Sequence, residues 1–305
     1  MLIEKRKNAA ESLIQRQGEL YMKKFMKKNW STVLLVMMFT VGLSLLLYPT
    51  VADWWNQFHA TRAIDSYSEA VATMSDEEYE KYLSDARAYN TSLLSEPNRF
   101  HPSDALHAEY ESVLDVAGDG IMGVVKIPSL RVNLPIYHGV EESTLQDAIG
   151  HIEGSSLPIG GESTHTIVSG HRGLPSAKLF TDLDQMEVGD YFMFVVLDDT
   201  YTYQVDQIKI VEPNDFTYLQ IEEGKDLATL QTCTPYGINT HRLLVRGHRV
   251  DNLPDDFVNA RSEAVLLNRN VVAIFVGVLL FVALGIGWIV KNIVKKRVER
   301  KDKGV

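Results

Sequence analysis

Two long uncharged apolar stretches bracket this chain and limit what it can fold into. The first covers residues 31–48 and the second covers residues 271–290. As helices they would rise roughly 27 and 30 Å, which is enough to cross the hydrocarbon core of a bilayer. Uncharged stretches of this length are uncommon in soluble cores. We therefore predict one transmembrane helix at 31–48 and a second at 271–290.

The distribution of charge predicts the orientation of these helices. Residues 1–30 carry eight Lys or Arg and three Asp or Glu, and residues 291–305 carry seven and two. The span between them, 31–290, carries 15 basic and 35 acidic residues. Short basic flanks remain cytoplasmic, so both basic tails are expected inside and the large middle segment outside. The acidic exterior gives no support for nucleic-acid binding, whereas the lipid bilayer is an expected partner.

The first apolar stretch has two interpretations. No small-residue cleavage site follows it directly, since residues 48–53 read YPTVAD. An uncleaved signal-anchor is therefore favoured over a cleaved signal peptide. Either interpretation exports the middle segment.

Residues 49–119 are predicted to form an extracellular helical module that ends in a loop. Pro49 marks a break after the membrane helix. Four apolar residues then recur at helical spacing, as on one helix face: Ile64, Tyr67, Val71 and Met74. Ser75 and Glu78 form the pattern of a capping box, which starts a second helix. Residues 95–119 are polar and rich in turn formers, which predicts a long surface loop.

From residue 120 to residue 253 the sequence is typical of a mainly β domain. Short runs rich in Val, Ile, Tyr and Thr alternate with turn residues, at 120–139, 164–170, 190–197, 200–213, 226–233 and 242–250. Many short strands at short intervals favour a β-barrel or a β-sandwich. A polar linker at 254–270 then leads to the second membrane helix.

Cys233 is the one cysteine of the 305 residues. The strand-like run LATLQT leads to it, and the turn-like TPYG follows it, so its side chain is expected at a rim. A free cysteine can also be a small buried apolar residue. An unpaired cysteine in an exported protein instead indicates a reactive thiol or an intermolecular link. The thiolate is a strong nucleophile, and we favour this role.

A thiol nucleophile needs a proton partner, and His171 is the best candidate. It follows a predicted strand and lies in the loop SGHRG, whose glycines allow close approach. His138 and His151 also neighbour glycines but are weaker candidates. His241 is close to Cys233 in sequence, although it is expected to begin a strand.

Arg242 is the candidate donor for the oxyanion of an acyl-transfer reaction. Its guanidinium is a rigid, permanently charged fork of donors. Arg246 shares its strand face but lies further from the cysteine loop, and a surface ion pair is expected there. The order of these candidates along the chain is His, Cys, Arg. Papain-like hydrolases place Cys before His, so this order speaks against that class.

The run at 229–249, TLQTCTPYGINTHRLLVRGHR, resembles the signature of class C sortases. These are the pilus-polymerising cysteine transpeptidases of Gram-positive bacteria. GVVKIPSLRVNLPIYHGV and GHIEGSSLPIGGESTHTIVSGHRGLPSAKLFTDLD match the family as well. The resemblance implies an eight-stranded sortase-type β-barrel preceded by a helical module. It also implies His171 as general acid/base, Cys233 as nucleophile and Arg242 as the residue that stabilises oxyanion and substrate.

The reaction implied by the resemblance is a transpeptidation without cofactor or metal. The thiol would cleave a Leu-Pro-x-Thr-Gly-like sorting signal between Thr and Gly, and a pilin lysine amine would accept the thioacyl group. The alternative within the family is a sortase that anchors surface proteins to a peptidoglycan amine. A hydrolase that releases the acyl group to water is a third possibility. A non-catalytic surface protein with a β-rich binding domain is a fourth, against which the Cys, His and Arg set counts.

The sequence departs from the family in one loop. Class C sortases carry an Asp-Pro-aromatic lid over the active site, whereas the corresponding stretch here is Arg99 to Asp104, RFHPSD. The proline is present, but His101 stands for the aspartate and Ser103 for the aromatic residue. The remaining lid candidates are Phe100, His101 and Pro102. We hypothesise that this atypical lid controls the site only weakly.

Overall fold

The computed structural model describes residues 29–254, together with Gly277 and Gly285. Four predicted segments lie wholly or mostly outside the described residues: the tail at 1–30, the linker at 254–270, the membrane helix at 271–290 and the tail at 291–305.

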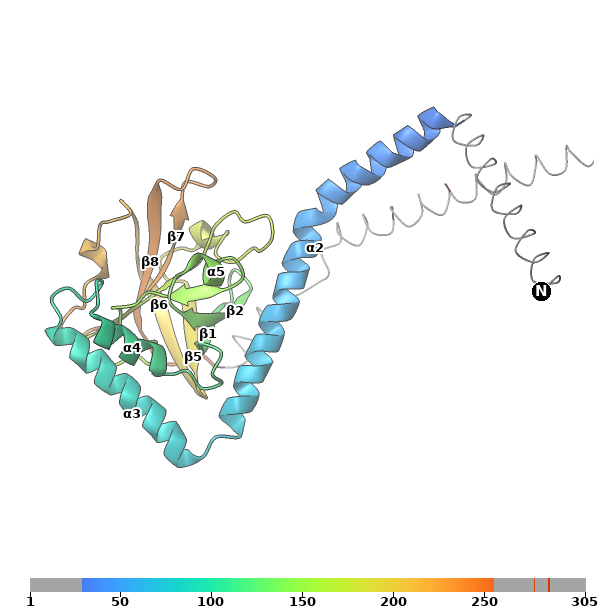
Figure 1. Cartoon of the computed structure of the whole chain (residues 1–305). Helices are drawn as coiled ribbons and strands as arrows, with labels where there is room; N and C mark the ends of the chain where they lie inside the picture. The colour runs from blue at the N-terminus through green and yellow to red at the C-terminus, as the bar shows by residue number, and fades with distance from the viewer. Residues whose placement is uncertain (1–28, 255–276, 278–284, 286–305) are drawn as a thin grey trace, which may run out of the picture. The chain divides into compact units, whose positions relative to one another are not determined.

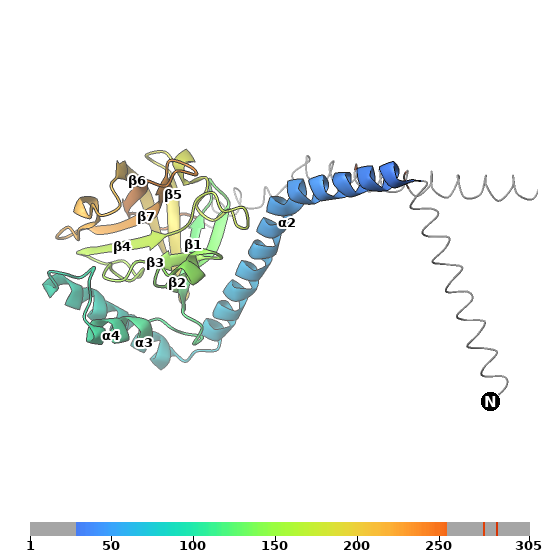
Figure 2. The same ribbon diagram turned by 45° about the horizontal axis from the view of Figure 1, so that its top comes forward.

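The longest helix, α2 (Trp30–Ala72), contains the whole of the first predicted membrane segment and continues well beyond it. Among the described residues, it is the one helix that is long and apolar enough to cross a membrane, by length and composition. The predicted break at Pro49 is wrong, because the helix runs through this proline. A proline inside a helix removes one hydrogen bond and favours a kink, and α2 bends along its length without ending (Figure 2).

The next helix, α3 (Asp76–Ser92), begins at the predicted capping box. The Ser75 hydroxyl accepts a hydrogen bond from the Glu78 amide, and the Glu78 carboxylate accepts one from the Ser75 amide. A single 3-10 turn, η1 (Leu93–Ser95), extends the helix.

The stretch 95–119 is not the continuous surface loop that its polar residues predict. It contains a third helix, α4 (Asp104–Ser112), whose first turn is capped by the Ser103 hydroxyl. Tyr110 in this helix and Leu114 after it are fully buried. A helix of this length depends on tertiary packing rather than on local propensity, which explains why the sequence pattern missed it.

Eight strands close into a barrel, as the resemblance implies. They are β1 (Ile121–Ile127), β2 (Val132–His138), β3 (Ile149–His151), β4 (Thr164–Ser169), β5 (Tyr191–Val196), β6 (Asp199–Val211), β7 (Asp226–Thr234) and β8 (His241–Arg249). Their order around the barrel is β1-β2-β3-β4-β7-β8-β6-β5. Every predicted strand run overlaps at least one of these strands. The three-residue β3, and the short helix α5 (Glu142–Leu145) before it, were not predicted.

Two parallel strand pairs decide which strand ends meet. β4 pairs in parallel with β7, and β2 with β3, whereas β3–β4 and β7–β8 are antiparallel. Parallel neighbours end at the same edge, and an antiparallel strand begins where its neighbour ends. The ends of β4 and β7 and the starts of β3 and β8 therefore lie together at one rim of the barrel.

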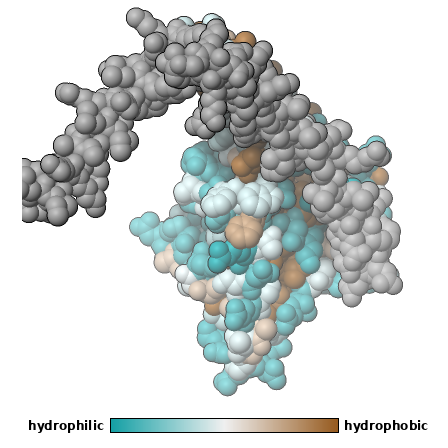
Figure 3. Space-filling model, turned by 90° about the vertical axis from the view of Figure 1, so that its right-hand side faces the viewer, coloured by the Kyte–Doolittle hydropathy of each residue, from teal (hydrophilic) through white to brown (hydrophobic). Residues whose placement is uncertain are grey.

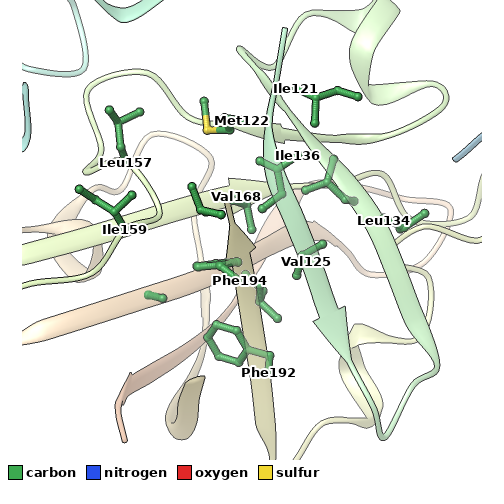
Figure 4. Close-up of a cluster of buried hydrophobic side chains, with 14 of the residues drawn as sticks. Ile121, Met122, Val125, Leu134, Ile136, Leu157, Ile159, Val168, Phe192 and Phe194 are labelled. Atoms are coloured by element: carbon green, nitrogen blue, oxygen red, sulfur yellow. The ribbon is translucent and has the colours of Figure 1, made fainter. Parts of the chain in front are cut away.

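The barrel interior is a packed apolar core. Fully buried side chains from several strands meet there, among them Val125, Ile136, Val168, Phe192 and Phe194 (Figure 4). β-branched and aromatic side chains suit such a surface, in agreement with the Val- and Ile-rich runs of the sequence.

The helical module packs directly on the barrel. α2 and α3 flank it on different sides (Figure 1). The hydroxyl of Tyr67 in α2 accepts from the Leu197 amide at 2.7 Å and donates to the Met122 carbonyl oxygen at 3.3 Å. The side chain of Asn90 in α3 exchanges two hydrogen bonds with the Leu157 backbone. The face of the described residues seen in Figure 3 is mainly hydrophilic, with small hydrophobic areas.

Candidate active site

Cys233 and Arg242 are direct cross-strand partners at the rim where β7 ends and β8 begins. Opposed residues of an antiparallel pair place their side chains on the same face, with Cβ atoms about 4.5–5.5 Å apart. Both residues are partly exposed, whereas Thr232 and Thr234 beside the cysteine are buried. Because side chains alternate along a strand, the thiol and the guanidinium share the outer face. The thiol is free, and it lies at the rim as predicted rather than in the core.

His171 lies next to the end of β7, immediately beyond β4. The register of β4 along β7 continues past the last paired residue, because the Gly170 amide donates to the Gln231 carbonyl oxygen at 3.1 Å. The Thr232 hydroxyl then donates to the Gly170 carbonyl oxygen at 2.7 Å. His171 and Cys233 are the next residues on the two segments. The structure thus brings the three predicted catalytic residues to one rim.

The backbone around His171 is fixed by close packing. A Cβ atom on Gly170 would lie 2.5 Å from Cδ1 of Ile149 and 2.9 Å from the ring of Phe180, so a larger residue would displace these side chains. The Phe180 amide also donates to the His171 carbonyl oxygen at 3.2 Å. The histidine side chain itself is one quarter exposed, so the ring faces the rim from a rigid support.

The histidine loop is bound to the cysteine loop by Arg172. Its guanidinium donates to the Thr234 hydroxyl at 3.3 Å, pairs with Asp184 at 2.5 Å and lies 5.8 Å from the ring centroid of Tyr236. Gly173 has a φ of +78°, and its α-carbon faces the same tyrosine ring. These contacts fix the loop after β4 to the loop after β7.

The weaker histidine candidates are structural. His151 is fully buried, with Nε2 2.9 Å from the Ser156 carbonyl oxygen, and burial lowers its pKa to about 3. The ring nitrogens of His138 face the carbonyl oxygens of Gly120 at 3.0 Å and Val113 at 2.7 Å. Both rings therefore hold backbone segments together.

Arg246 of β8 forms ion pairs, as predicted. Its guanidinium pairs with both oxygens of Asp206, at 3.0 and 3.1 Å, and with Glu222 at 2.9 Å. His241 begins the strand, as expected, and lies 3.4 Å from Glu212. These groups are occupied by structural contacts.

A small apolar cluster lies on the outer face beside the cysteine–arginine pair. Its buried members are Ile167, Val211, Leu219 and Leu244, and Phe100, Ile152 and Phe216 pack against them. Val211 is the cross-strand partner of Arg242, and Leu244 lies two residues further along β8. The alternation of strand side chains places this cluster on the same face as the site. We call it the outer cluster.

The lid-region residues are attached to this outer cluster. The ring of Phe100 stacks on Phe216, with centroids 4.8 Å apart, and the Arg99 guanidinium lies 4.4 Å from the Phe100 centroid. Arg99 donates to the Leu219 carbonyl oxygen at 2.7 Å, and burial lowers its pKa to about 10. His101 is exposed and Pro102 half-buried. The weak control of the site by this segment stays a prediction.

The carboxylate nearest to His171 was not predicted from the sequence. Glu142 of α5 places a carboxylate oxygen 3.5 Å from Nε2 of His171. The acidic residues after the second predicted strand look like an ordinary solvated loop in the sequence. Only the pairing of β3 with β4 brings this loop to the histidine.

Comparisons with known proteins agree with this geometry. A family model described as the sortase domain matches residues 125–250, which include all three candidate catalytic residues. The crystal structure of sortase C1 from Streptococcus agalactiae is 52% identical, covers 63% of this chain and 100% of its own, and superposes with a TM-score of 0.62. This chain belongs to the sortase family.

Further similar proteins support the assignment of this chain to the sortase family. An X-ray structure of Clostridium perfringens sortase C with the C-terminal cell wall sorting motif is 39% identical, with a TM-score of 0.56, and covers 63% of this chain and 100% of its own. Sortase D of Bacillus subtilis (strain 168) is 28% identical over 131 residues, which is 42% of this chain and 63% of the relative. The sortase spans less than two thirds of the length of the curated relatives it matches. The structural neighbours place it in class C, within a family of cysteine transpeptidases.

Proposed function

We propose that this sortase is a membrane-anchored transpeptidase that joins pilin subunits. It would cleave a Leu-Pro-x-Thr-Gly-like sorting signal between Thr and Gly and transfer the acyl group to a pilin lysine. The observation that carries the proposal is the convergence of Cys233, Arg242 and His171 at one barrel rim. The C. perfringens neighbour with its sorting motif supports the substrate class.

In the first half-reaction, the thiolate of Cys233 attacks the threonine carbonyl carbon. The resulting oxyanion is stabilised by the guanidinium of Arg242, which projects from the opposite strand on the same face. The carbon–nitrogen bond then breaks, and the imidazolium of His171 protonates the departing glycine amine. A thioester between Cys233 and the threonine carbonyl remains on the enzyme.

In the second half-reaction, the neutral lysine amine attacks the thioester carbonyl. His171 accepts the proton that the amine loses, and the thiolate of Cys233 departs. An isopeptide bond forms, and the enzyme returns to its starting state. Covalent catalysis thus divides one amide exchange into two steps with the same groups.

The apolar helix α2 and the charge distribution support a membrane location. The apolar part of α2 would anchor the barrel on the outer surface, where exported pilins emerge. The second anchor at 271–290 and the cytoplasmic position of both tails belong to the same proposal.

The test is covalent assembly in vitro. Full-length enzyme in detergent is incubated with a pilin that carries a sorting signal, and products are separated on denaturing gels. We expect ladders with wild type, none with Cys233→Ala or His171→Ala, and normal ladders with His248→Ala, because this exposed histidine lies further along β8. Ladders formed by Cys233→Ala would refute the proposal.

The same assay separates the two acceptors. If pilin monomers are joined only to an added peptidoglycan-type amine and never to each other, the enzyme is a cell-wall-anchoring sortase instead. Release of the acyl group to water alone would identify a hydrolase.

A further inference from the structure

The side chain of His171 has one close anionic neighbour. Oε2 of Glu142 lies 3.5 Å from Nε2 of the ring, and among the described residues no other carboxylate is recorded within 4 Å of it. Nε2 has less than 1 Å² of accessible surface and no hydrogen-bond partner in the described part of the chain. A buried ring nitrogen without a hydrogen-bond partner costs free energy. Glu142, its nearest charged neighbour, is therefore the natural candidate for a partner.

The topology of the barrel explains why the carboxylate is there. α5 lies in the connection from β2 to β3, and β3 begins where β4 ends, because the two strands are antiparallel. Gly150 pairs with Ser169, so the residues just before β3 run beside those just after β4. Glu142 is thus brought to His171 by the same strand order that brings Cys233 there.

The surroundings of the carboxylate leave it free to act on the histidine. Its side chain is 72% exposed, and its other oxygen lies 3.5 Å from Nε2 of the Gln146 side chain, one turn along the helix. A movement of about half an ångström would turn the 3.5 Å contact into a charge-assisted hydrogen bond of about 2.8–3.0 Å. α5 has only four residues, so such a movement disturbs no long element.

The charged and titratable groups around the ring come from four elements. They are Glu142 on α5, Cys233 on β7, Arg242 on β8, and Arg172 with its partner Asp184 in the segment after β4. The carboxylate of Asp184 is already neutralised by Arg172 at 2.5 Å. Glu142 is therefore the anion available to a positive charge on the imidazole.

We infer that Glu142 is a positioning residue of this sortase, which orients the His171 ring and stabilises its protonated form. The inference rests on the proposed function, in which His171 donates a proton to one amine and accepts a proton from another. Each half-reaction passes through an imidazolium, and a facing carboxylate stabilises that cation. In this role Glu142 acts only through the histidine.

The test compares Glu142→Gln with Glu141→Gln in the full-length enzyme. Both changes remove one exposed negative charge, but Glu141 is the residue before α5, and its carboxylate folds back onto Gly139. At 3.5 Å in a largely solvated setting, the charge contributes about a fivefold rate effect. We expect Glu142→Gln to lower kcat for a fluorogenic sorting-signal peptide about three- to tenfold at unchanged KM.

The pH profile distinguishes this role from a structural one. We expect the descending limb of kcat/KM to move to lower pH in Glu142→Gln, to be restored in part by Glu142→Asp, and to be unchanged in Glu141→Gln. An unmoved limb with kcat within twofold of wild type would overturn the inference, and so would a change confined to the KM of the acceptor amine.

A separate readout keeps this inference apart from the proposed function. The rate of alkylation of Cys233 as a function of pH needs no substrate, and the chain has no other cysteine. If wild type alkylates with a pH profile that Glu142→Gln shifts, yet no peptide is cleaved, the proposed function fails and the coupling of Glu142 to the site stands. If peptide is cleaved and neither profile shifts, the inference alone fails.

Discussion

Replacement of Phe100, His101 and Pro102 by alanine tests whether the lid region controls access to the thiol. The Phe100 side chain packs against the outer cluster, where its ring stacks on Phe216 and lies beneath the Arg99 guanidinium. His101 is exposed. We expect the triple variant to react with a thiol reagent at a rate within twofold of wild type, because these contacts hold the segment beside the thiol rather than over it.

The size of the effect can be worked out for the opposite case. Aromatic stacking contributes about 0.5–1.5 kcal/mol and a cation–π contact about 0.5–2 kcal/mol. If these contacts held a closed lid over Cys233, their loss would raise the open population. Because about 1.4 kcal/mol corresponds to a factor of ten in an equilibrium constant, the labelling rate would rise by about fivefold to several hundredfold. The two interpretations therefore differ by more than the error of a rate measurement.

The assay is timed alkylation of the single cysteine, followed by mass spectrometry of the intact protein. The matched control is Val188→Ala, which trims an exposed apolar side chain before β5. An acceleration of about fivefold or more in the triple variant, with the control unchanged, would refute the reasoning and identify a gate. Arg99 is kept in this variant, because its hydrogen bond to the Leu219 carbonyl oxygen anchors the segment itself.

Three further predictions concern stability, each measured by urea unfolding. Tyr67→Phe removes a buried hydroxyl with two backbone partners, so it should cost about 1–3 kcal/mol. Arg246→Met removes the two-pronged contact with partly exposed Asp206, and the loss should be smaller, about 1–2 kcal/mol; an unchanged midpoint would show that this pair contributes nothing. Burial lowers the pKa of His151 to about 3 and of His165 to about 4. The unfolded chain, with ordinary histidine pKa values near 6.5, therefore binds more protons below that pH. Stability should fall as pH drops from about 6.5 toward 4, by about 1.4 kcal/mol per pH unit for each ring, and His165→Asn should roughly halve that slope.

The strands of the barrel were predictable because their signal is local. Val- and Ile-rich runs separated by turn residues mark each long strand, and the capping box at Ser75 marks the start of α3. The continuation of α2 through Pro49 was not predictable, since one lost hydrogen bond is outweighed by a long run of helix on either side. α4, α5 and β3 were missed because each is too short to have a periodic pattern and depends on contacts with distant residues.

The candidate site was predictable only in part. Cys233 stands out in the sequence by being alone, and the SGHRG loop marks His171. Nothing local indicates that the two lie side by side, because parallel pairing of β4 with β7 joins segments that are far apart in the chain. The family resemblance supplied that relation. It did not supply Glu142, whose carboxylate reaches the histidine through the pairing of β3 with β4.

The strand order also explains why a nucleophile, an arginine and a histidine can meet here. β7 ends where antiparallel β8 begins, so Cys233 and Arg242 face each other across two neighbouring strands. β4 lies on the other side of β7 and ends at the same edge, so His171 follows without a long connection. Because side chains alternate along β7 and β8, the neighbours of the reactive pair, Thr232, Thr234 and Leu243, are buried behind it. A register shift of one residue in β7 would turn the thiol into the barrel core, so the geometry of the site depends on the same hydrogen-bond ladder that closes the barrel.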